Sequence, residues 1–296
     1  MNFRKSLCKS IALISIILLG IVSCVQKEIV RTQREPAKIA VVLGGGAARG
    51  FAHIGVLKIL ESNHIPIHMI VGTSAGSFVG SLYAYGLNAY QIQQLSLDIQ
   101  RVDIADFTIP DNGFIKGDLL EEYVNRMIRN TTMEKMRIPF YAVATEVPNG
   151  KETVFASGNT GKAVRASCSI PGVFNPVIIG NKMYVDGGVV SPVPVDAARR
   201  LGADIVIAVD ISSDLDTNKP SGTIETILQS INIMSSMISI AQLSRADIVI
   251  RPLVGHIGSS DFDKRNEAII EGEKAALQAL PRIREIIEQF GQQGRL

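Results

Sequence analysis

Short continuous apolar runs alternate along the chain with longer stretches in which apolar residues recur at helical spacing. The continuous runs predict buried strands over residues 38–43, 68–71, 139–145, 205–209 and 247–251. The helical spacing predicts helices over residues 51–61, 77–85, 89–97, 117–130, 160–167, 192–201 and 265–290. Two strand–helix units in succession favour an α/β fold with a mostly parallel central sheet, whose site lies at the carboxyl ends of the strands.

A β-hairpin is predicted in the second half of the chain. Residues 177–179 and 182–185 flank the two-residue turn Gly180-Asn181. The second arm of this hairpin runs into Asp186-Gly187-Gly188, and a further short strand is predicted over residues 152–155.

Two segments allow two interpretations each. Residues 224–243 form a predicted helix rich in Ile and Met, which we interpret as a buried core helix, with a lipid-facing lid as the alternative. The loop that contains residues 110–113 is long enough to be a flap over a site, although an ordinary surface loop is the simpler interpretation.

The amino terminus has the pattern of a secretory signal. Arg4, Lys5 and Lys9 precede an apolar run over residues 11–22, which is short for a transmembrane helix. The run ends in Leu19-Gly20-Ile21-Val22-Ser23-Cys24, which resembles a bacterial lipobox and so implies cleavage before Cys24 and a lipid on that cysteine. The alternative is an uncleaved membrane anchor.

This interpretation divides the chain into three parts. Residues 1–23 are the predicted lipoprotein signal peptide, residues 24–37 a flexible tether, and residues 38–296 one large globular domain. We expect an exported lipoprotein held at a bacterial membrane by its lipid. The residue after Cys24 is not Asp, so the outer membrane is the weakly favoured address in a bacterium with two membranes.

Cysteine content and charge argue against a disulfide-stabilised fold and against nucleic-acid binding. The chain has three cysteines, and after loss of Cys8 and lipidation of Cys24 only Cys168 remains, so no intramolecular disulfide is expected. Cys168 lies in an apolar-rich stretch, where a small core residue is a better interpretation than a nucleophile. Without residues 1–23 the chain holds 27 basic and 28 acidic residues, which gives no basic excess for nucleic acid.

The candidate chemistry centres on Gly72-Thr73-Ser74-Ala75-Gly76, which lies between a predicted strand and a predicted helix. This is the arrangement of a nucleophile elbow, in which small residues on both sides of the serine permit a sharp turn. The hydroxyl would then stand at the amino terminus of the helix, where free N–H groups favour a developing negative charge. A glycine-rich turn with an ordinary capping serine is the alternative.

A second glycine-rich turn, residues 44–50, follows the first predicted strand. The amides of Gly44, Gly45 and Gly46 can approach a substrate oxygen closely because no Cβ intervenes. Arg49 could add positive potential there or pair with a surface carboxylate. A nucleotide loop is the alternative, but the segment has neither the P-loop signature nor a clean dinucleotide-binding pattern.

A serine nucleophile needs a base, and two candidates follow Ser74 in the chain. His256 is the only histidine late enough for the order Ser–acid–His of α/β-hydrolases. Asp186, at the end of the predicted hairpin, could act directly on Ser74 if burial raised its proton affinity. Asp186 could equally be a turn residue that caps its own backbone.

Four segments together resemble the bacterial branch of the patatin-like phospholipase family. They are residues 44–57, the elbow at residues 72–76, residues 165–174, and Tyr184-Val185-Asp186-Gly187-Gly188 with the following Pro192-Val193-Pro194. The resemblance covers residues 38 to about 210, and the order and spacing of the motifs make it specific. No motif of the family is found after about residue 215.

The resemblance implies a three-layer α/β/α fold and a Ser–Asp dyad, with Ser74 as nucleophile and Asp186 as base. It implies an oxyanion hole in the loop Gly44, Gly45, Gly46 and Ala47, where Ala47 stands at a position that is Gly in many members. It implies hydrolysis of lipid acyl esters through an acyl-enzyme, with no metal and no cofactor, and it disfavours His256.

The sequence therefore predicts a membrane-tethered serine acyl hydrolase of the phospholipase A or lysophospholipase type, whose partners are an acyl-ester substrate and the membrane. Two alternatives are a non-catalytic lipoprotein that binds acyl chains and a small-ester esterase or acyltransferase that uses the same dyad.

Overall fold

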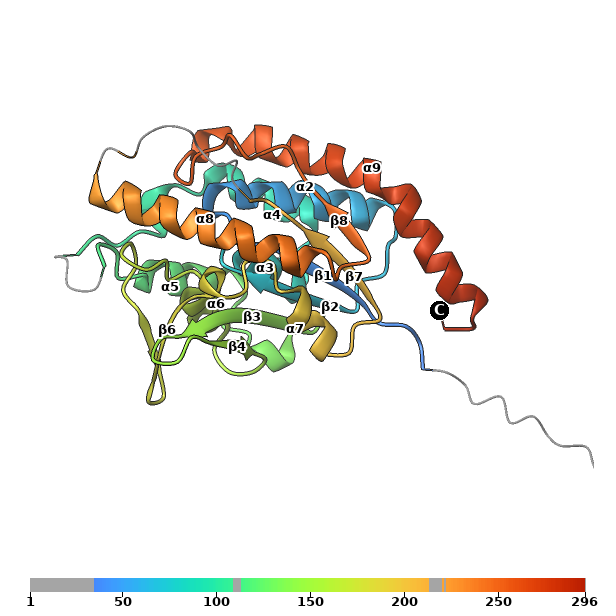
Figure 1. Ribbon diagram of the computed structural model, residues 1–296, viewed down its shortest axis with the longest axis horizontal. Coiled ribbons are helices and arrows are strands. Elements are labelled where there is room, and N and C mark those ends of the chain that lie inside the picture. The colour runs from blue at the N-terminus through green and yellow to red at the C-terminus, as the bar shows by residue number, and fades with distance from the viewer. Residues whose placement is uncertain (1–34, 109–112, 213–219, 221, 296) are drawn as a thin grey trace, which may run out of the picture. The chain divides into compact units, whose positions relative to one another are not determined.

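The computed structural model describes residues 35–108, 113–212, 220 and 222–295 (Figure 1). Within this part of the chain, eight strands form one sheet. They are β1 (Ile39–Leu43), β2 (Met69–Thr73), β3 (Phe140–Glu146), β4 (Lys151–Phe155), β5 (Val177–Ile179), β6 (Lys182–Asp186), β7 (Ile205–Val209) and β8 (Ile248–Ile250). Every residue of β1, β2 and β7 is buried, as their continuous apolar sequences predict.

The sheet is parallel through its centre and antiparallel at one side. Its order is β5-β6-β3-β2-β1-β7-β8, and β4 also pairs with β3. The strands from β3 to β8 along this order are parallel, whereas β4 and β6 run antiparallel to β3 and β5 runs antiparallel to β6. The predicted α/β fold with a mostly parallel central sheet is confirmed, and so is the hairpin at residues 177–185.

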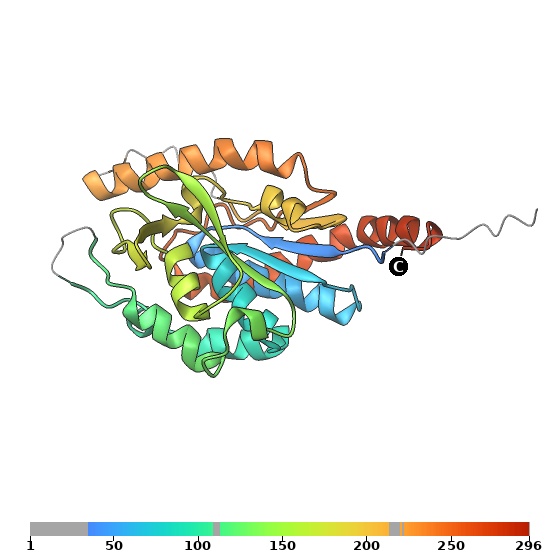
Figure 2. The ribbon, with the colours of Figure 1, turned by 90° about the horizontal axis from the view of Figure 1, so that it is seen from below.

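Helices cover both faces of the sheet, which gives the three layers visible in Figure 2. One face packs against α2 (Phe51–Ser62), α3 (Ala75–Tyr85), α4 (Ala89–Asp98), α5 (Asp118–Met127), α6 (Thr160–Ser167) and α9 (Arg265–Gln292). The other face packs against α7 (Val195–Arg200) and the carboxyl end of α8 (Thr223–Leu243). None of the helices in the described part of the chain is long and apolar enough to cross a bilayer.

Strand β3 brings together two distant parts of the chain. Its residues 142–146 all pair with β4, so β4 occupies one whole edge of this stretch. On the other edge, Val143 pairs with Thr73 of β2 and the next residue, Ala144, pairs with Asp186 of β6. The carboxyl ends of β2 and β6 therefore meet on this edge of β3. Ser74 directly follows the last residue of β2, and Asp186 is the last residue of β6.

Three helices differ from the sequence prediction. Helix α5 ends at Met127 rather than at residue 130. Helix α7 begins at Val195 rather than at residue 192, because Pro192 and Pro194 lack the N–H groups of a helix interior and Pro194 becomes the N-cap. The interpretation of residues 224–243 as a buried core helix is wrong. Most of the side chains of α8 whose burial is described are partly or largely exposed, and among them Ser239, Gln242 and Leu243 near the carboxyl end are buried.

Candidate active site

Ser74 lies at the sharp turn between β2 and α3. Its backbone has φ 53° and ψ −125°, a conformation that is strained for a residue with a side chain. The turn leaves no room beside it. A Cβ on Gly72 would lie 2.6 Å from the backbone of Gly76, and one on Gly76 would lie 2.0 Å from the carbonyl oxygen of Leu43. These short distances confirm the prediction that the turn accepts only small residues on both sides of the serine.

The turn is held from outside by Ser167, at the end of α6. The backbone N–H of Ser74 donates to Oγ of Ser167 at 2.9 Å, and this hydroxyl donates to the carbonyl of Val143 on β3 at 2.6 Å. Ser167 is fully buried. One hydroxyl therefore connects the strained elbow to the strand that carries the pairing partners of both β2 and β6.

Asp186 ends β6 on the same edge of β3, and its backbone is fixed at both polar groups. Its N–H donates to the carbonyl of Ser169 at 2.8 Å, and its carbonyl accepts from the Thr145 hydroxyl at 2.9 Å. Its side-chain Oδ1 accepts from the N–H of Gly188 at 2.7 Å. Oδ2 is buried and has no hydrogen-bond partner within the described residues.

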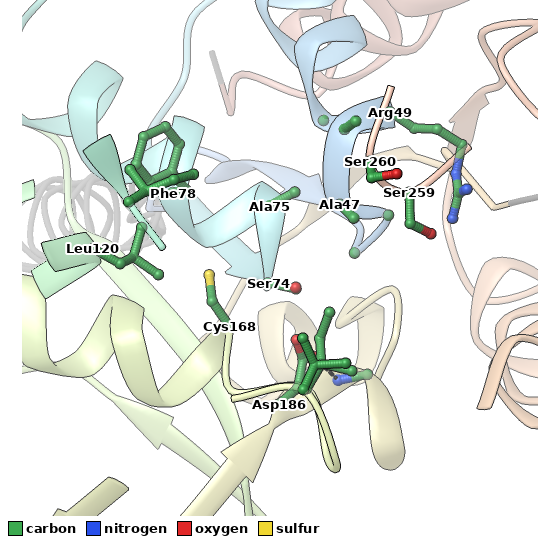
Figure 3. A pocket seen from close by; sticks show the side chains of 18 of the residues that line it. Ala47, Arg49, Ser74, Ala75, Phe78, Leu120, Cys168, Asp186, Ser259 and Ser260 are labelled. Atoms are coloured by element: carbon green, nitrogen blue, oxygen red, sulfur yellow. Dashed lines mark hydrogen bonds between the residues drawn. The ribbon is translucent and has the colours of Figure 1, made fainter. Parts of the chain in front are cut away.

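Ser74 and Asp186 lie beside one cavity, as Figure 3 shows. Burial raises the pKa of Asp186 to about 6, although the Ser74 hydroxyl and the Gly188 N–H both act to lower it. The hydroxyl is thus close enough to interact with the carboxylate, yet the pair does not meet the geometry of a hydrogen bond. A carboxyl group with a raised pKa and a free oxygen next to a serine has the properties of a general base.

The glycine-rich turn after β1 lies against the serine. A Cβ on Gly45 would be 3.3 Å from Cβ of Ser74. The N–H of Gly44 donates to Val209 at 3.1 Å and that of Gly45 donates to Pro192 at 2.9 Å, so both amides are engaged within the fold. The amides of Gly46 and Ala47 have no partner among the described residues. Of the four predicted oxyanion donors, these two are available to a substrate.

Arg49 and His53 hold this turn in place through hydrogen bonds to backbone carbonyls. Arg49 is buried, and its guanidinium donates to the carbonyls of Ile211 at 2.8 Å and Ile257 at 3.1 Å, which ties the turn to two later segments. His53 is fully buried in α2, and Nε2 lies 2.8 Å from the carbonyl oxygen of Gly44. Burial lowers the pKa of His53 to about 4, so the neutral ring donates this bond through Nε2–H.

The cavity around Ser74 has a volume of about 450 Å³ and is lined mainly by apolar side chains. Its apolar walls come mainly from the helices α2, α3, α4, α5 and α8 and from the loop after α6. They include Ile54, Phe78, Leu82, Ile92, Leu120, Tyr123, Ile170, Phe174, Leu228 and Ile231. A site of this size and apolar lining suits a hydrocarbon chain.

The other candidates from the sequence lie elsewhere or lack reactivity. His256 is half exposed, does not line the cavity, and pairs with Glu267 of α9 at 2.6 Å. Cys168 lines the cavity, but burial raises the pKa of its thiol, which keeps the sulfur protonated and weakly nucleophilic. The signal peptide, Cys24, most of the tether and residues 110–112 of the predicted flap lie outside the described residues.

Comparison with known proteins assigns the family. The model of the family described as patatin-like phospholipase matches residues 41–199, which contain the glycine-rich turn, the elbow and Asp186. The chain belongs to the patatin-like phospholipase family. Its three-layer fold with a mostly parallel sheet is that of a patatin-like domain.

Relatives of this patatin-like domain are much longer proteins. Patatin-like phospholipase domain-containing protein 6 of Homo sapiens is 34% identical over 188 residues, which are 61% of this chain and 14% of that protein. Lysophospholipase NTE1 of Pyricularia oryzae is 29% identical over 281 residues, which cover 83% of this chain and 19% of that protein. The chain thus spans less than a fifth of the length of these relatives.

A solved structure agrees with the fold. VipD from Legionella pneumophila superposes with a TM-score of 0.58 at 14% identity, over 84% of this chain and 67% of that chain. At this identity the likeness concerns the fold alone.

Three features of the patatin-like site were not found by sequence reasoning. Ser167 lies in the motif at residues 165–174, but the motif carries no signal for its bond to the elbow. His53 lies in the motif at residues 44–57, but its hydrogen bond to the carbonyl of Gly44 depends on how α2 packs against the turn in the folded chain. The contribution of α8 to the cavity wall does not follow from the preferred interpretation of residues 224–243 as a core helix, and only the alternative of a lipid-facing lid points to it.

Proposed function

We propose that this chain is a serine acyl hydrolase that cleaves ester bonds of lipids, in the manner of a phospholipase A or lysophospholipase. Family membership and the names of the two relatives support a lipid ester as substrate. The observation that carries the proposal is the meeting of β2 and β6 on one edge of β3, with the unpartnered Oδ2 of Asp186 beside Ser74.

In the first half of the proposed reaction, Oγ of Ser74 attacks the ester carbonyl carbon and its proton passes to the Asp186 carboxylate. The carbonyl oxygen becomes an oxyanion, which the free amides of Gly46 and Ala47 stabilise. One such donor contributes roughly 3–4 kcal/mol to the transition state. Collapse of the intermediate breaks the bond to the alcohol, which leaves with the proton held by Asp186, and the acyl group remains on Ser74.

In the second half, water transfers a proton to Asp186 and attacks the acyl-enzyme. The second oxyanion collapses, the fatty acid leaves, and Ser74 recovers its proton from Asp186. The apolar cavity holds the acyl chain during both steps, which accounts for its size and lining. No step requires a metal or a cofactor.

Labelling with a fluorophosphonate, followed by mass mapping, tests the dyad. We expect one label on Ser74, no label in Ser74→Ala, and a labelling rate reduced by about a hundredfold or more in Asp186→Asn, as for the loss of a general base. His256→Ala is the matched control and should label like the wild type. Normal labelling without Asp186 but not without His256 would assign the base to the histidine.

Two further outcomes would favour one of the alternative functions. A stable acyl group on Ser74 without turnover would indicate a protein that binds acyl chains. Faster turnover of short soluble esters than of micellar lipid would indicate an esterase or acyltransferase.

We also propose that the domain is tethered to a bacterial membrane through a lipid on Cys24, with the outer membrane as its address in a bacterium that has two membranes. The apolar run over residues 11–22 and the lipobox-like segment before Cys24 support this proposal. Metabolic incorporation of a tagged fatty acid should occur in the wild type and be lost in Cys24→Ser. Incorporation that survives this substitution would contradict the anchor.

A further inference from the structure

Helix α8 has almost no charge and exposes a stripe of large apolar side chains. Over its 21 residues the only charged residue is Glu225. Ile233, Met234, Met237 and Ile240 are 45%, 56%, 68% and 65% exposed. Positions 233, 237 and 240 follow the spacing of one helix face. Figure 2 shows α8 as the outermost element of its layer, with the sheet on its other side.

The opposite face of α8 belongs to the candidate active site. Leu228, Ile231 and Ser235 are among its residues that line the cavity. The Ser235 hydroxyl donates to the carbonyl of Gly188 at 3.0 Å, and the N–H of Gly188 donates to Oδ1 of Asp186. One helix therefore separates the exterior from the cavity and contacts the residue that orients the proposed base.

The carboxyl end of α8 attaches the helix to the rest of the fold. Gln242 is buried, its Oε1 accepts from the N–H of Val193 at 3.1 Å, and its Nε2 donates to Oγ of Ser191 at 3.1 Å. Leu243 packs in the core against the sheet. The exposed stripe is thus fixed in position relative to the cavity.

Apolar side chains are also exposed at the rim of the cavity. Phe107 and Val189 both line the cavity, yet they are 77% and 36% exposed. The molecule therefore exposes apolar side chains both on the outer face of α8 and where the cavity reaches the surface. Large apolar side chains that are exposed together on one helix face are typical of an interaction site.

We propose that the outer face of α8, made by Ile233, Met234, Met237 and Ile240, docks on the surface of a lipid bilayer. This inference rests on the proposed function, because a lipid substrate must leave an aggregate to reach Ser74. A lipid surface fits better than a protein partner, since the opposite face of the same helix lines the substrate cavity and the exposed face offers no charge for specific pairing. The predicted lipid on Cys24 would hold the domain near such a surface.

The composition of α8 also determines the kind of lipid. Most interfacial helices carry Lys and Arg on a polar face and depend on anionic lipid. In α8 the face opposite the stripe lines the cavity, and Glu225 is the one charged residue. Docking should therefore proceed on zwitterionic lipid and change little with salt.

The chain contains no tryptophan, so a single introduced tryptophan reports on one position. We would place it at Met237 in the full chain, in a Ser74→Ala background that leaves the lipid intact. The matched control is Leu277→Trp on α9, which is 51% exposed in the layer across the sheet. Fluorescence would be recorded with phosphatidylcholine vesicles and with vesicles of brominated phosphatidylcholine.

We expect a blue shift and bromine quenching for Met237→Trp, and neither for Leu277→Trp. Because both variants keep the same amino terminus, a membrane anchor alone cannot produce this difference. No response of Met237→Trp to vesicles would overturn the proposal, and so would an equal response at both positions. A blue shift that appears without vesicles and grows with protein concentration would assign the face to a second copy of the chain.

Activity provides a second test. The double variant Ile233→Asn, Met237→Asn should lose about tenfold or more of its rate on phosphatidylcholine vesicles, while turnover of a short monomeric ester stays unchanged. The double variant Ile270→Asn, Leu277→Asn on α9 is the control and should keep both rates. An equal loss on both substrates would contradict docking by α8.

The two proposals fail in different ways. If the wild type neither labels at Ser74 nor hydrolyses any ester, the proposed function fails, whereas the fluorescence test of α8 still gives its result.

Discussion

The variant Asp186→Asn should inactivate the domain and stabilise it at neutral pH. The amide keeps an oxygen that can accept from the Gly188 N–H, and its NH₂ group takes the place of Oδ2, which has no partner among the described residues. The substitution therefore removes a buried negative charge without removing the main hydrogen bond of the side chain.

The magnitude follows from the pKa of Asp186, which burial raises from 3.8 to about 6. A shift of about two units corresponds to about 3 kcal/mol. Below about pH 3 the carboxyl group is protonated in both the folded and the unfolded chain, so its ionisation does not affect stability. As the pH rises from about 3 to about 7, the unfolded chain releases this proton first, and the wild type loses stability. Asn does not ionise and avoids this loss.

The assay is urea unfolding of wild type and variant between pH 3 and pH 8. The free energy of unfolding of Asp186→Asn relative to the wild type should rise by about 3 kcal/mol between about pH 3 and about pH 7 and then stay level. Asp263→Asn, at an exposed position, controls for the loss of one negative charge. A difference that stays constant with pH, or that falls as pH rises, would refute the assignment of a raised pKa to Asp186.

Three further predictions concern the residues around the dyad. Ser167→Ala leaves the buried N–H of Ser74 without its acceptor, so we expect a loss of about 1–3 kcal/mol in stability and a slower reaction of Ser74 with fluorophosphonate. His53→Leu removes the donor to Gly44, and kcat should fall about tenfold with little change in KM because the bond supports the turn rather than the substrate. Gly45→Ala places a Cβ 3.3 Å from Cβ of Ser74, and kcat should fall by about a hundredfold if the turn moves away and one oxyanion donor is lost.

Each of these predictions has a control that separates the site from general stability. Ser81→Ala removes another buried hydroxyl, which bonds to Phe78 within α3, and labelling should be unchanged. His53→Gln retains a donor and should recover part of the rate. Because the ionised carboxylate of Asp186 is the proposed base, kcat/KM should rise with pH near 6, and this rise should be the same in wild type and in the His53 variants. Gly291→Ala, with no atom within 4 Å of its new Cβ, should be silent. Equal effects in the controls would contradict the roles assigned to these residues.

Local patterns were sufficient for most of the secondary structure. The strands β1, β2 and β7 are continuous apolar runs because they are buried on both faces, and such runs are visible in a sequence without a structure. The elbow at Ser74 could also be predicted, because the steric demand of the turn selects glycine at positions 72 and 76, which are local in the chain. The resemblance of four ordered motifs then predicted the family and the fold.

Long-range pairing decided what the motifs do together. The proximity of Ser74 and Asp186 depends on β2 and β6 sharing one edge of β3, and no local pattern specifies that register. The raised pKa of Asp186 depends on burial by the assembled fold. The engagement of Gly44 and Gly45, which leaves Gly46 and Ala47 as donors, likewise depends on Val209 and Pro192 far along the chain.

Helix α8 shows the limit of composition most clearly. Its Ile and Met residues are as suitable for a core as for an exposed apolar face. Hydrophobicity measures the tendency of a side chain to leave water, but it does not specify the surface against which the side chain then packs. The sequence by itself predicted that residues 224–243 form an apolar, nearly uncharged helix. Only the tertiary structure decided that one face closes the cavity while the other is exposed, because the sheet offers α8 a buried contact at its carboxyl end alone.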